Sequence, residues 1–466
     1  MQIALKTKSE PKFFPSNAIL GLDTCAIQPI MQLCTSMYNL IITGWPGAFN
    51  LHIFCKKCLL LEILVVTLTT NNEASYITMQ NFDYQTPTRL IFGKNVVAEK
   101  LQGVMAQFGN RVLITYGGGS IKRSGLYDQV LTLLSDKEIY ELPGIEPNPK
   151  FNPSVLEGVR LCKEHAIDVL LAVGGGSVLD CTKAIAGAAC SDADPWDIVT
   201  GKAPTLKAIP IVDIITLAAT GSEYDQGGVI SRTETNDKLA YFSPFVFPAV
   251  SFIDPTYTFT LPVKQTLAGV ADCINHIMEQ YFCGEHILMN DAFMEGAVKS
   301  LVKNVKVVLD EPTNYDARAE IFYATTLGCN GIYSLGNSES GWPMHALEHA
   351  LSGHYDITHG EGLAIVTPRW MRYILNHTTG ELHEQVVERI TSFGSHVFGT
   401  VTPEESIQAI HAFYEGIGIP MTLHAVGIDD SRIDEMAHHI AVNEGLDQAW
   451  VPLYEEDIAA ILRDCL

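Results

Sequence analysis

The sequence has little basic charge and no regular cysteine spacing, and each shortage excludes a class of protein. Lysine and arginine number 30 against 53 aspartate and glutamate residues, which gives a net charge of -23. A chain with this balance repels a phosphate backbone, so we expect no nucleic-acid partner. The 11 cysteines follow no repeating pattern. This is typical of a reduced intracellular protein rather than a disulfide framework.

Signals for secretion and for membrane insertion are also missing. The first residues include Lys6 and Lys12 but lead into no apolar stretch with a small-residue cleavage site. The strongest apolar run, residues 59–70, contains Glu62 and is shorter than the ~20 residues that a membrane-spanning helix needs. We therefore expect a cytoplasmic protein with no membrane partner.

Residues 1–78 differ in kind from the rest of the chain. They are rich in cysteine and aliphatic residues and show no amphipathic helical period. Cys55 and Cys58 form a CxxC pair without the second pair or the histidines of a zinc finger, so we interpret them as unrelated to metal binding. Met79 opens a stretch that looks like a natural protein start. We predict that residues 1–78 are a dispensable extension and not a folded domain.

From about residue 111 to residue 254, short apolar runs alternate with helical segments, as in β-α units around a parallel sheet. After Pro262 the chain has long amphipathic stretches and few strand signals. The predicted fold is an α/β dinucleotide-binding domain with a Rossmann-like parallel sheet over residues 79–258, followed by an all-α domain over residues 259–466.

Two of the predicted strands run directly into three glycines and a serine. "RVLITY" is followed by residues 117–120, and "IDVLLAV" by residues 174–177. Glycines at a strand-to-helix turn let backbone amides approach an anion, and the helix N-terminus adds a partial positive charge. A third run, "AIPIVDIIT", leads to Thr220 and Ser222. Two such turns in consecutive units favour a bound diphosphate, although neither has the GxGxxG pattern of the usual Rossmann turn.

The first glycine turn also indicates which nucleotide binds. It offers Ser120, Lys122 and Arg123. A hydroxyl and cations suit the 2′-phosphate of NADP(H), whereas a carboxylate would suit the 2′-hydroxyl of NAD(H). Asp180 lies in the first turn of the helix after the second glycine turn, where it either interacts with the helix dipole or holds the turn.

Most of the histidines lie in the predicted helical half, and two pairs have helical spacing. Asp272 and His276 are four residues apart, as are His345 and His349, so each pair shares one helix face. Alone, Asp272 and His276 fit a helix-surface hydrogen bond as well as metal ligation, and His345 and His349 alone fit core or surface histidines better than ligands. The joint occurrence of the two pairs behind a nucleotide-binding half favours a metal site. His354 and His359 follow in a loop. Three nitrogen ligands and one carboxylate would suit one divalent ion, Fe(II) or Zn(II).

With these features, the chain resembles the iron-containing, group III alcohol dehydrogenases, and in particular their NADPH-dependent butanol dehydrogenase and aldehyde reductase branch. The resemblance covers Met79 to the C-terminus. It rests on "TPTRLIFGK", "LITYGGGSIKRSG", "PGIEPNP", "LAVGGGSVLDCTK", "ATGSE", "GVADCINHIMEQY" and "MHALEHALSGHYDITHGEG". It implies a dehydroquinate synthase-like architecture, in which the helical domain binds the metal.

The resemblance also implies the residues of the site. The implied metal ligands are Asp272, His276, His345 and His359. The implied or expected cofactor contacts are Gly118, Gly119, Ser120, Gly175, Gly176, Ser177, Asp180, Thr216, Thr220, Ser222, Lys238 and Tyr257. Many relatives have "TTAGTGSE" where this chain has "TLAATGSE", which makes the contacts of Thr216 less certain than those of the glycine turns.

The function predicted from these residues is NADP(H)-linked interconversion of a primary alcohol and its aldehyde, such as butanol and butanal. His349 is the candidate proton relay, with a purely structural role as the alternative. Two rival functions remain. One is a glycerol-phosphate or sugar-phosphate enzyme of the same fold, and the other is a nucleotide-binding protein without redox activity. We expect a homodimer whose partners are small aldehydes or alcohols.

Overall fold

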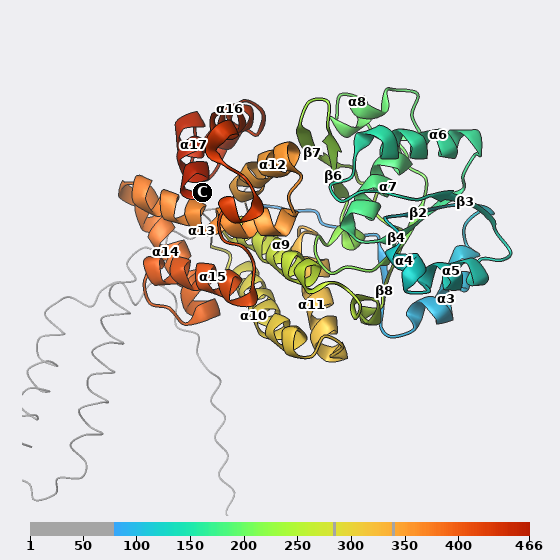
Figure 1. The fold of residues 1–466 in the computed structure, drawn as a ribbon, viewed down its shortest axis with the longest axis horizontal. Coiled ribbons are helices and arrows are strands. Elements are labelled where there is room, and N and C mark those ends of the chain that lie inside the picture. The colour runs from blue at the N-terminus through green and yellow to red at the C-terminus, as the bar shows by residue number, and fades with distance from the viewer. Residues whose placement is uncertain (1–78, 283–285, 338–340) are drawn as a thin grey trace, which may run out of the picture. The chain divides into compact units, whose positions relative to one another are not determined.

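A computed structural model describes residues 79–282, 286–337 and 341–466 of the chain. In this part of the chain, a half built around a β-sheet is followed by a half built of helices, and the two lie side by side (Figure 1). The predicted fold class is confirmed. The predictions for residues 1–78, including the Cys55 and Cys58 pair, lie outside the described residues.

The main sheet has six strands, all of them parallel, in the order β1-β8-β5-β4-β2-β3. Its central strands read as continuous apolar runs because both faces of the sheet are covered. The strands are β1 (Arg89–Phe92), β2 (Arg111–Tyr116), β3 (Glu138–Leu142), β4 (Val169–Gly174), β5 (Ile211–Ile215) and β8 (Val250–Ile253).

Helices cover both faces of this sheet. Successive side chains of a strand point to opposite faces, so Leu113 packs in the core under α6 and α7 while Val112 and Ile114 pack in the core under α3 and α5. The helices of this half are α3 (Val96–Met105), α4 (Ser120–Arg123), α5 (Leu126–Leu133), α6 (Leu156–Glu164), α7 (Gly176–Ala188) and α8 (Pro195–Val199).

A separate antiparallel hairpin, which the sequence analysis did not anticipate, extends from the sheet half towards the helices. It consists of β6 (Gly227–Arg232) and β7 (Asp237–Phe242). Its turn approaches α12 (Pro343–Tyr355) closely, since a Cβ atom added at Gly353 would lie 2.6 Å from the carbonyl oxygen of Asn236. The hairpin therefore brings side chains of the sheet half up to the helical half.

The helical half forms one large apolar core around α9 (Val263–Tyr281), which is buried along most of its length. No helix of the described residues is long and apolar enough to cross a membrane. The predicted domain boundary at residue 258 falls in the connection between β8 and α9. The other helices are α10 (Leu288–Asp310), α11 (Tyr315–Gly328), α13 (His359–His377), α14 (Gly380–Phe398), α15 (Pro403–Ile417), α16 (Ile433–Asn443) and α17 (Glu455–Asp464).

Candidate metal centre and nucleotide cleft

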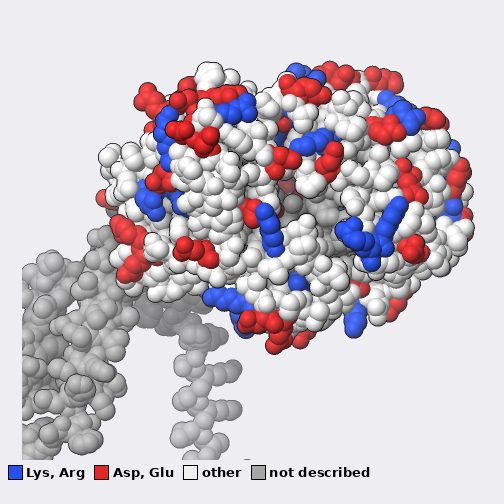
Figure 2. Space-filling model, viewed as in Figure 1, with Lys and Arg blue, Asp and Glu red and all other residues white. Residues whose placement is uncertain are grey.

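A cavity of about 1760 Å³ is lined by residues of both halves. A hollow between the two lobes is visible in Figure 2, where acidic and basic side chains are interspersed over the described surface. The glycine turns lie along one side of the cavity and the four predicted metal ligands along the other. The cavity therefore brings together the two groups of residues that the sequence analysis selected.

The carboxyl ends of β2, β4 and β5 supply the sheet side of the cavity. Gly118, Gly175 and Gly176 line it, whereas Gly119, the residue before α4 with a φ of 96°, does not. A Cβ atom at Gly176 would lie 2.5 Å from Oγ1 of Thr220, so glycine is required where the second turn meets the loop after β5. Ser177, Thr216 and Tyr257 also line the cavity.

The three polar side chains of the first turn point in different directions. Ser120 and Arg123 line the cavity. Lys122 instead places its Nζ 5.0 Å from the ring centre of Tyr116 and 4.4 Å from that of Tyr127. A cation over aromatic faces is a stabilising surface contact. Of the cations considered for the 2′-phosphate, only Arg123 lies at the cavity.

Asp180 and Ser222 line the cavity but bond to each other and to the chain. The Ser222 hydroxyl donates to Oδ1 of Asp180 at 2.7 Å, and the Val229 amide donates to Oδ2 at 3.0 Å. Burial raises the pKa of Asp180 to about 6. Of the two roles considered for Asp180, the structure shows that of holding the turn, because the carboxylate ties α7 to the Ser222 loop and to β6.

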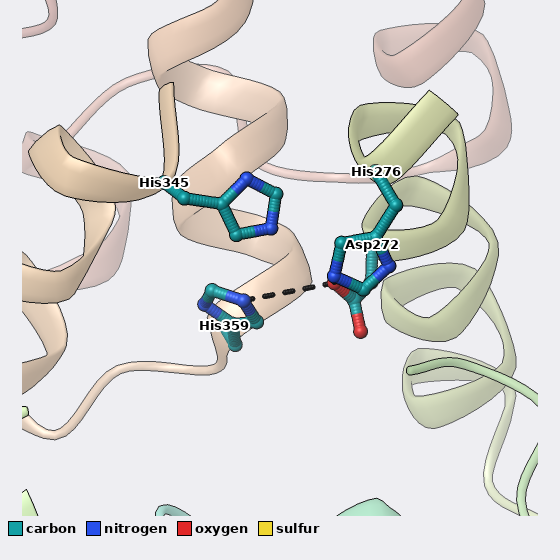
Figure 3. A group of neighbouring side chains, drawn as sticks. All are labelled: Asp272, His276, His345 and His359. Carbon is teal, nitrogen blue, oxygen red and sulfur yellow. Dashed lines mark ion pairs between the residues drawn. The ribbon is translucent and has the colours of Figure 1, made fainter. Parts of the chain in front are cut away.

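On the helical side, four side chains point toward one another (Figure 3). Asp272 and His276 come from α9, His345 from α12, and His359 is the first residue of α13. One nitrogen or oxygen atom from each lies within 4.8 Å of the others. Oδ1 of Asp272 is 3.5 Å from Nε2 of His276 and 3.6 Å from Nε2 of His359.

Two glycines allow the close packing that assembles this cluster. A Cβ atom at Gly360 would lie 1.9 Å from the carbonyl oxygen of Ala268 on α9. At Gly269, a Cβ atom would lie 2.2 Å from the carbonyl oxygen of Ala218, in the loop after β5. Real Cβ contacts are not this short, so only glycine permits α9 to touch both α13 and the nucleotide loops.

The cluster has the chemistry of a cation site. Oδ1 of Asp272 and Nε2 of His345 are buried without a hydrogen-bond partner among the described residues. Burial, and then the neighbouring histidines, lower the pKa of His345 well below its usual range, and burial also lowers the pKa of His276. These neutral imidazoles keep a lone pair for a metal. Together with the His359 ring, they supply three imidazole nitrogens, which with one carboxylate fit a divalent ion.

His349 lies beside the cluster, with its ring centre 5.6 Å from that of His359 and 6.1 Å from that of His345. It lines the cavity, and its Nε2 is buried without a partner in the described part of the chain. Burial, followed by the charge of Lys238, lowers its pKa well below the usual range. The ordinary histidine pKa that first suggested a proton relay therefore does not apply here.

Lys238, predicted as a cofactor contact, lines the cavity, but its ammonium group lies at the histidine cluster. It donates to Oε2 of Glu348 at 3.1 Å, and its side chain is only 4% exposed. Glu348 and Glu279 both contact histidines of the cluster, and the sequence analysis missed both. The signal was a glutamate three residues after His276 and another three residues after His345.

The two glutamates differ in charge state. Burial raises the pKa of Glu279 well above its usual range. Burial acts in the same direction on Glu348, but its electrostatic and hydrogen-bonding contacts with His359 and Lys238 outweigh burial and hold the pKa of Glu348 well below the usual range. Glu348 is therefore ionised, and Glu279 is the more easily protonated of the pair.

Family models match most of the chain in two consecutive parts. "Iron-containing alcohol dehydrogenase" matches residues 87–255, and "Fe-containing alcohol dehydrogenase family, C-terminal" matches residues 266–466. The chain belongs to the iron-containing alcohol dehydrogenase family.

Similar members of this family carry names with either nicotinamide cofactor. The chain is 41% identical over 399 residues to NADH-dependent butanol dehydrogenase A of Clostridium acetobutylicum, covering 83% of this chain and 99% of the relative. It is 40% identical over 363 residues to the NADPH-dependent aldehyde reductase YqhD of Escherichia coli, covering 76% of this chain and 91% of the relative.

A crystal structure in this family has the same fold. NADH-dependent butanol dehydrogenase A from Thermotoga maritima aligns with a TM-score of 0.78 at 34% sequence identity, covering 84% of this chain and 100% of that one.

Proposed function

We propose that this chain is a metal-dependent, NADP(H)-linked alcohol dehydrogenase that works as an aldehyde reductase on substrates such as butanal. The observation that carries the proposal is the shared cavity, lined by two glycine turns on one side and by Asp272, His276, His345 and His359 on the other. A nucleotide on the glycine turns and a substrate at the cluster would then occupy one shared cavity.

Those four side chains are the proposed metal ligands. A divalent ion there, Fe(II) or Zn(II), would supply Lewis-acid polarisation of the aldehyde oxygen during hydride transfer from the nicotinamide. The glycine turns would hold the cofactor diphosphate at backbone amides and at the start of α7.

His349 is the proposed proton relay between the substrate oxygen and solvent. Its support is position, because Nε2 is unpartnered within the described residues and the side chain lines the cavity beside the cluster. The low pKa makes the neutral ring the resting form. The relay would therefore pass a proton in at one ring nitrogen and out at the other without a lasting imidazolium.

A preference for NADP(H) is supported by Ser120 and Arg123 at the first turn. Among the described residues of that turn, those that line the cavity include no carboxylate. A carboxylate is the group that would repel a 2′-phosphate and favour NAD(H). Butanal reduction with each cofactor tests the preference, and we expect kcat/KM for NADPH to exceed that for NADH by at least about tenfold. Equal values, or a preference for NADH, would contradict it.

The phosphorylated-substrate alternative is disfavoured by the charges of the cavity. Its cationic lining residues, among those described, are Arg123, Lys238 and Lys264. Lys238 and Lys264 are paired with Glu348 at 3.1 Å and Glu361 at 3.0 Å. The buried Lys238 ammonium group is therefore not free to neutralise a substrate phosphate, whereas Lys264, whose side chain is 64% exposed, forms only a surface ion pair. The alternative without redox activity predicts a lost ligand, but all four residues are in place.

The metal, the assembly and the location are further proposals. We propose Fe(II) or Zn(II) as the ion, a homodimer as the assembly and the cytoplasm as the location. Metal analysis of freshly purified protein and sedimentation equilibrium test the first two.

A further inference from the structure

We propose that Glu279 and Glu348 are positioning residues of the metal centre, which rests on the proposed function above. Each accepts a hydrogen bond from Nδ1 of one ligand histidine and leaves Nε2 of that ring for the ion. The two rings are those of His345 and His359. Their orientation, and with it the affinity for the ion, would depend on two carboxyl groups that do not themselves touch the ion.

Glu348 is fully buried and serves as a common acceptor for three side chains. Lys238 donates to its Oε2 at 3.1 Å, Ser352 donates to its Oε1, and Nδ1 of His359 lies against Oε2. A buried carboxylate this well satisfied is held in one rotamer. It therefore presents a fixed oxygen to the His359 ring.

The contacts of Glu348 also determine where the proton on His359 lies. Nζ of Lys238 is 3.2 Å from Nδ1 of His359, which in isolation would suggest a bond between them. If Nδ1 of His359 carried a lone pair, that lone pair would face Oε2 of Glu348, and two hydrogen-bond acceptors would lie against each other. With the proton on Nδ1, both Lys238 and His359 donate to Oε2 of Glu348. Nζ of Lys238 and Nδ1 of His359 then lie close together because they share this acceptor. Nε2, 3.6 Å from Asp272, then carries the free lone pair.

Glu279 orients the other ligand histidine, His345, in the same way. Its Oε1 accepts from the backbone amide of His345 at 2.8 Å and lies 3.2 Å from Nδ1 of the same residue. One oxygen therefore fixes both the first turn of α12 and the ring that projects from it. Nε2 of His345 is left without a partner in the described part of the chain.

His276 provides an internal contrast, because no glutamate orients its ring. Its Nδ1 is buried without a partner among the described residues, and its ring stacks on that of His345 at 4.8 Å between centres. Orienting His345 would thus also orient His276 by packing. A carboxyl group behind a ligand histidine commonly fixes its tautomer, and losing it weakens metal binding by about 10- to 100-fold.

The test measures metal affinity rather than turnover. Full-length protein is stripped with a chelator, and the Kd for Zn(II) is obtained by competition with a chromogenic chelator. Glu348→Leu and Glu279→Leu, which remove the acceptor oxygens, should each weaken binding by about 10- to 100-fold. Glu279→Gln, which keeps an acceptor oxygen, should stay within a few-fold of the parent. With Co(II), the first two variants should also change the visible spectrum.

Glu295→Gln is the matched control. Glu295 is a buried carboxyl group that also contacts a histidine, with Oε1 at 2.7 Å from Nδ1 of His396, but it lies outside the cluster. Its loss should leave the Zn(II) affinity unchanged. Wild-type affinity in both Glu348→Leu and Glu279→Leu would overturn the proposal.

The double variant Lys238→Met with Glu348→Leu separates positioning from charge balance. If Glu348 only neutralises Lys238, the double variant regains wild-type affinity, and the role of Glu348 is refuted. If Glu348 orients His359, the loss persists. The double variant leaves no unpaired buried charge, so it replaces the single variant should that one fail to fold. Failure of the proposed function looks different, because the parent protein would then bind Zn(II) no better than Asp272→Ala.

Discussion

The two sides of the cavity present different chemical groups. The sheet side offers backbone and hydroxyl groups at the ends of strands, and Asp180, a buried carboxylate that lines this side, bonds to loops of the chain. The helical side offers imidazoles and a carboxylate that have buried atoms without partners. A polyanionic cofactor needs many hydrogen-bond donors in a fixed arrangement, whereas a cation needs a few strong ligands. Mutations should therefore affect the two sides in different ways.

The largest effect should follow from removing a proposed ligand. Asp272→Ala or His359→Ala should lower turnover by at least about a thousandfold, because Lewis-acid stabilisation is worth several kcal/mol and ~4 kcal/mol corresponds to that factor. Cofactor binding, measured by fluorescence titration of NADPH, should change little, since the nucleotide lies on the other side. His396→Ala, a histidine outside the cluster, is the control. Retained turnover with no bound metal would refute the ligand assignment.

The contact between α9 and α13 can be tested through Gly360. Gly360→Ala places a methyl group where the carbonyl oxygen of Ala268 now lies, so it should destabilise the fold by about 1–3 kcal/mol and lower metal content. Gly416→Ala, in a helix position with no atom within 4 Å of an added Cβ, should instead raise stability slightly. Thermal melting of the two variants compares them. Equal melting temperatures would contradict the packing argument.

A smaller effect is expected on the sheet side. Ser120→Asp should lower the NADPH to NADH ratio of kcat/KM by about tenfold, because the new carboxylate repels a 2′-phosphate that NADH lacks. Thr132→Asp adds the same charge at an exposed position of α5 that does not line the cavity. It should leave the ratio unchanged. An unaltered ratio in Ser120→Asp would show that this hydroxyl is not at the phosphate.

The smallest effect is expected from shortening the chain. A protein starting at Met79 should match the full chain in turnover and melting temperature. One starting at Pro87 should be impaired, because Gln80 and Phe82 line the cavity and the Tyr84 hydroxyl donates to the Asn330 carbonyl at 3.2 Å. A large loss on starting at Met79 would give residues 1–78 a role.

The difference between the sheet side and the helical side also explains which features could be predicted from the sequence. The strands β2 and β4 were predicted because each is a continuous apolar run that ends in glycine, and the spacing of Asp272 and His276 put both on one helix face. The β6-β7 hairpin was missed because its strands, GGVISR and DKLAYF, mix glycine and charged residues with apolar ones instead of forming continuous apolar runs. Glu348 was missed because a charged residue within a helix is usually solvent-exposed, and only the folded chain shows it buried between Lys238 and His359.

The central claim is that this enzyme reduces an aldehyde at a metal held by the helical side. The direct measurement is NADPH oxidation with butanal by protein stripped of metal, followed by addition of Fe(II) or Zn(II). We predict that stripping abolishes turnover, that one of the two ions restores it, and that restored activity saturates at one ion per chain. Full turnover by metal-free protein, or no turnover after saturation with either ion, would contradict the account.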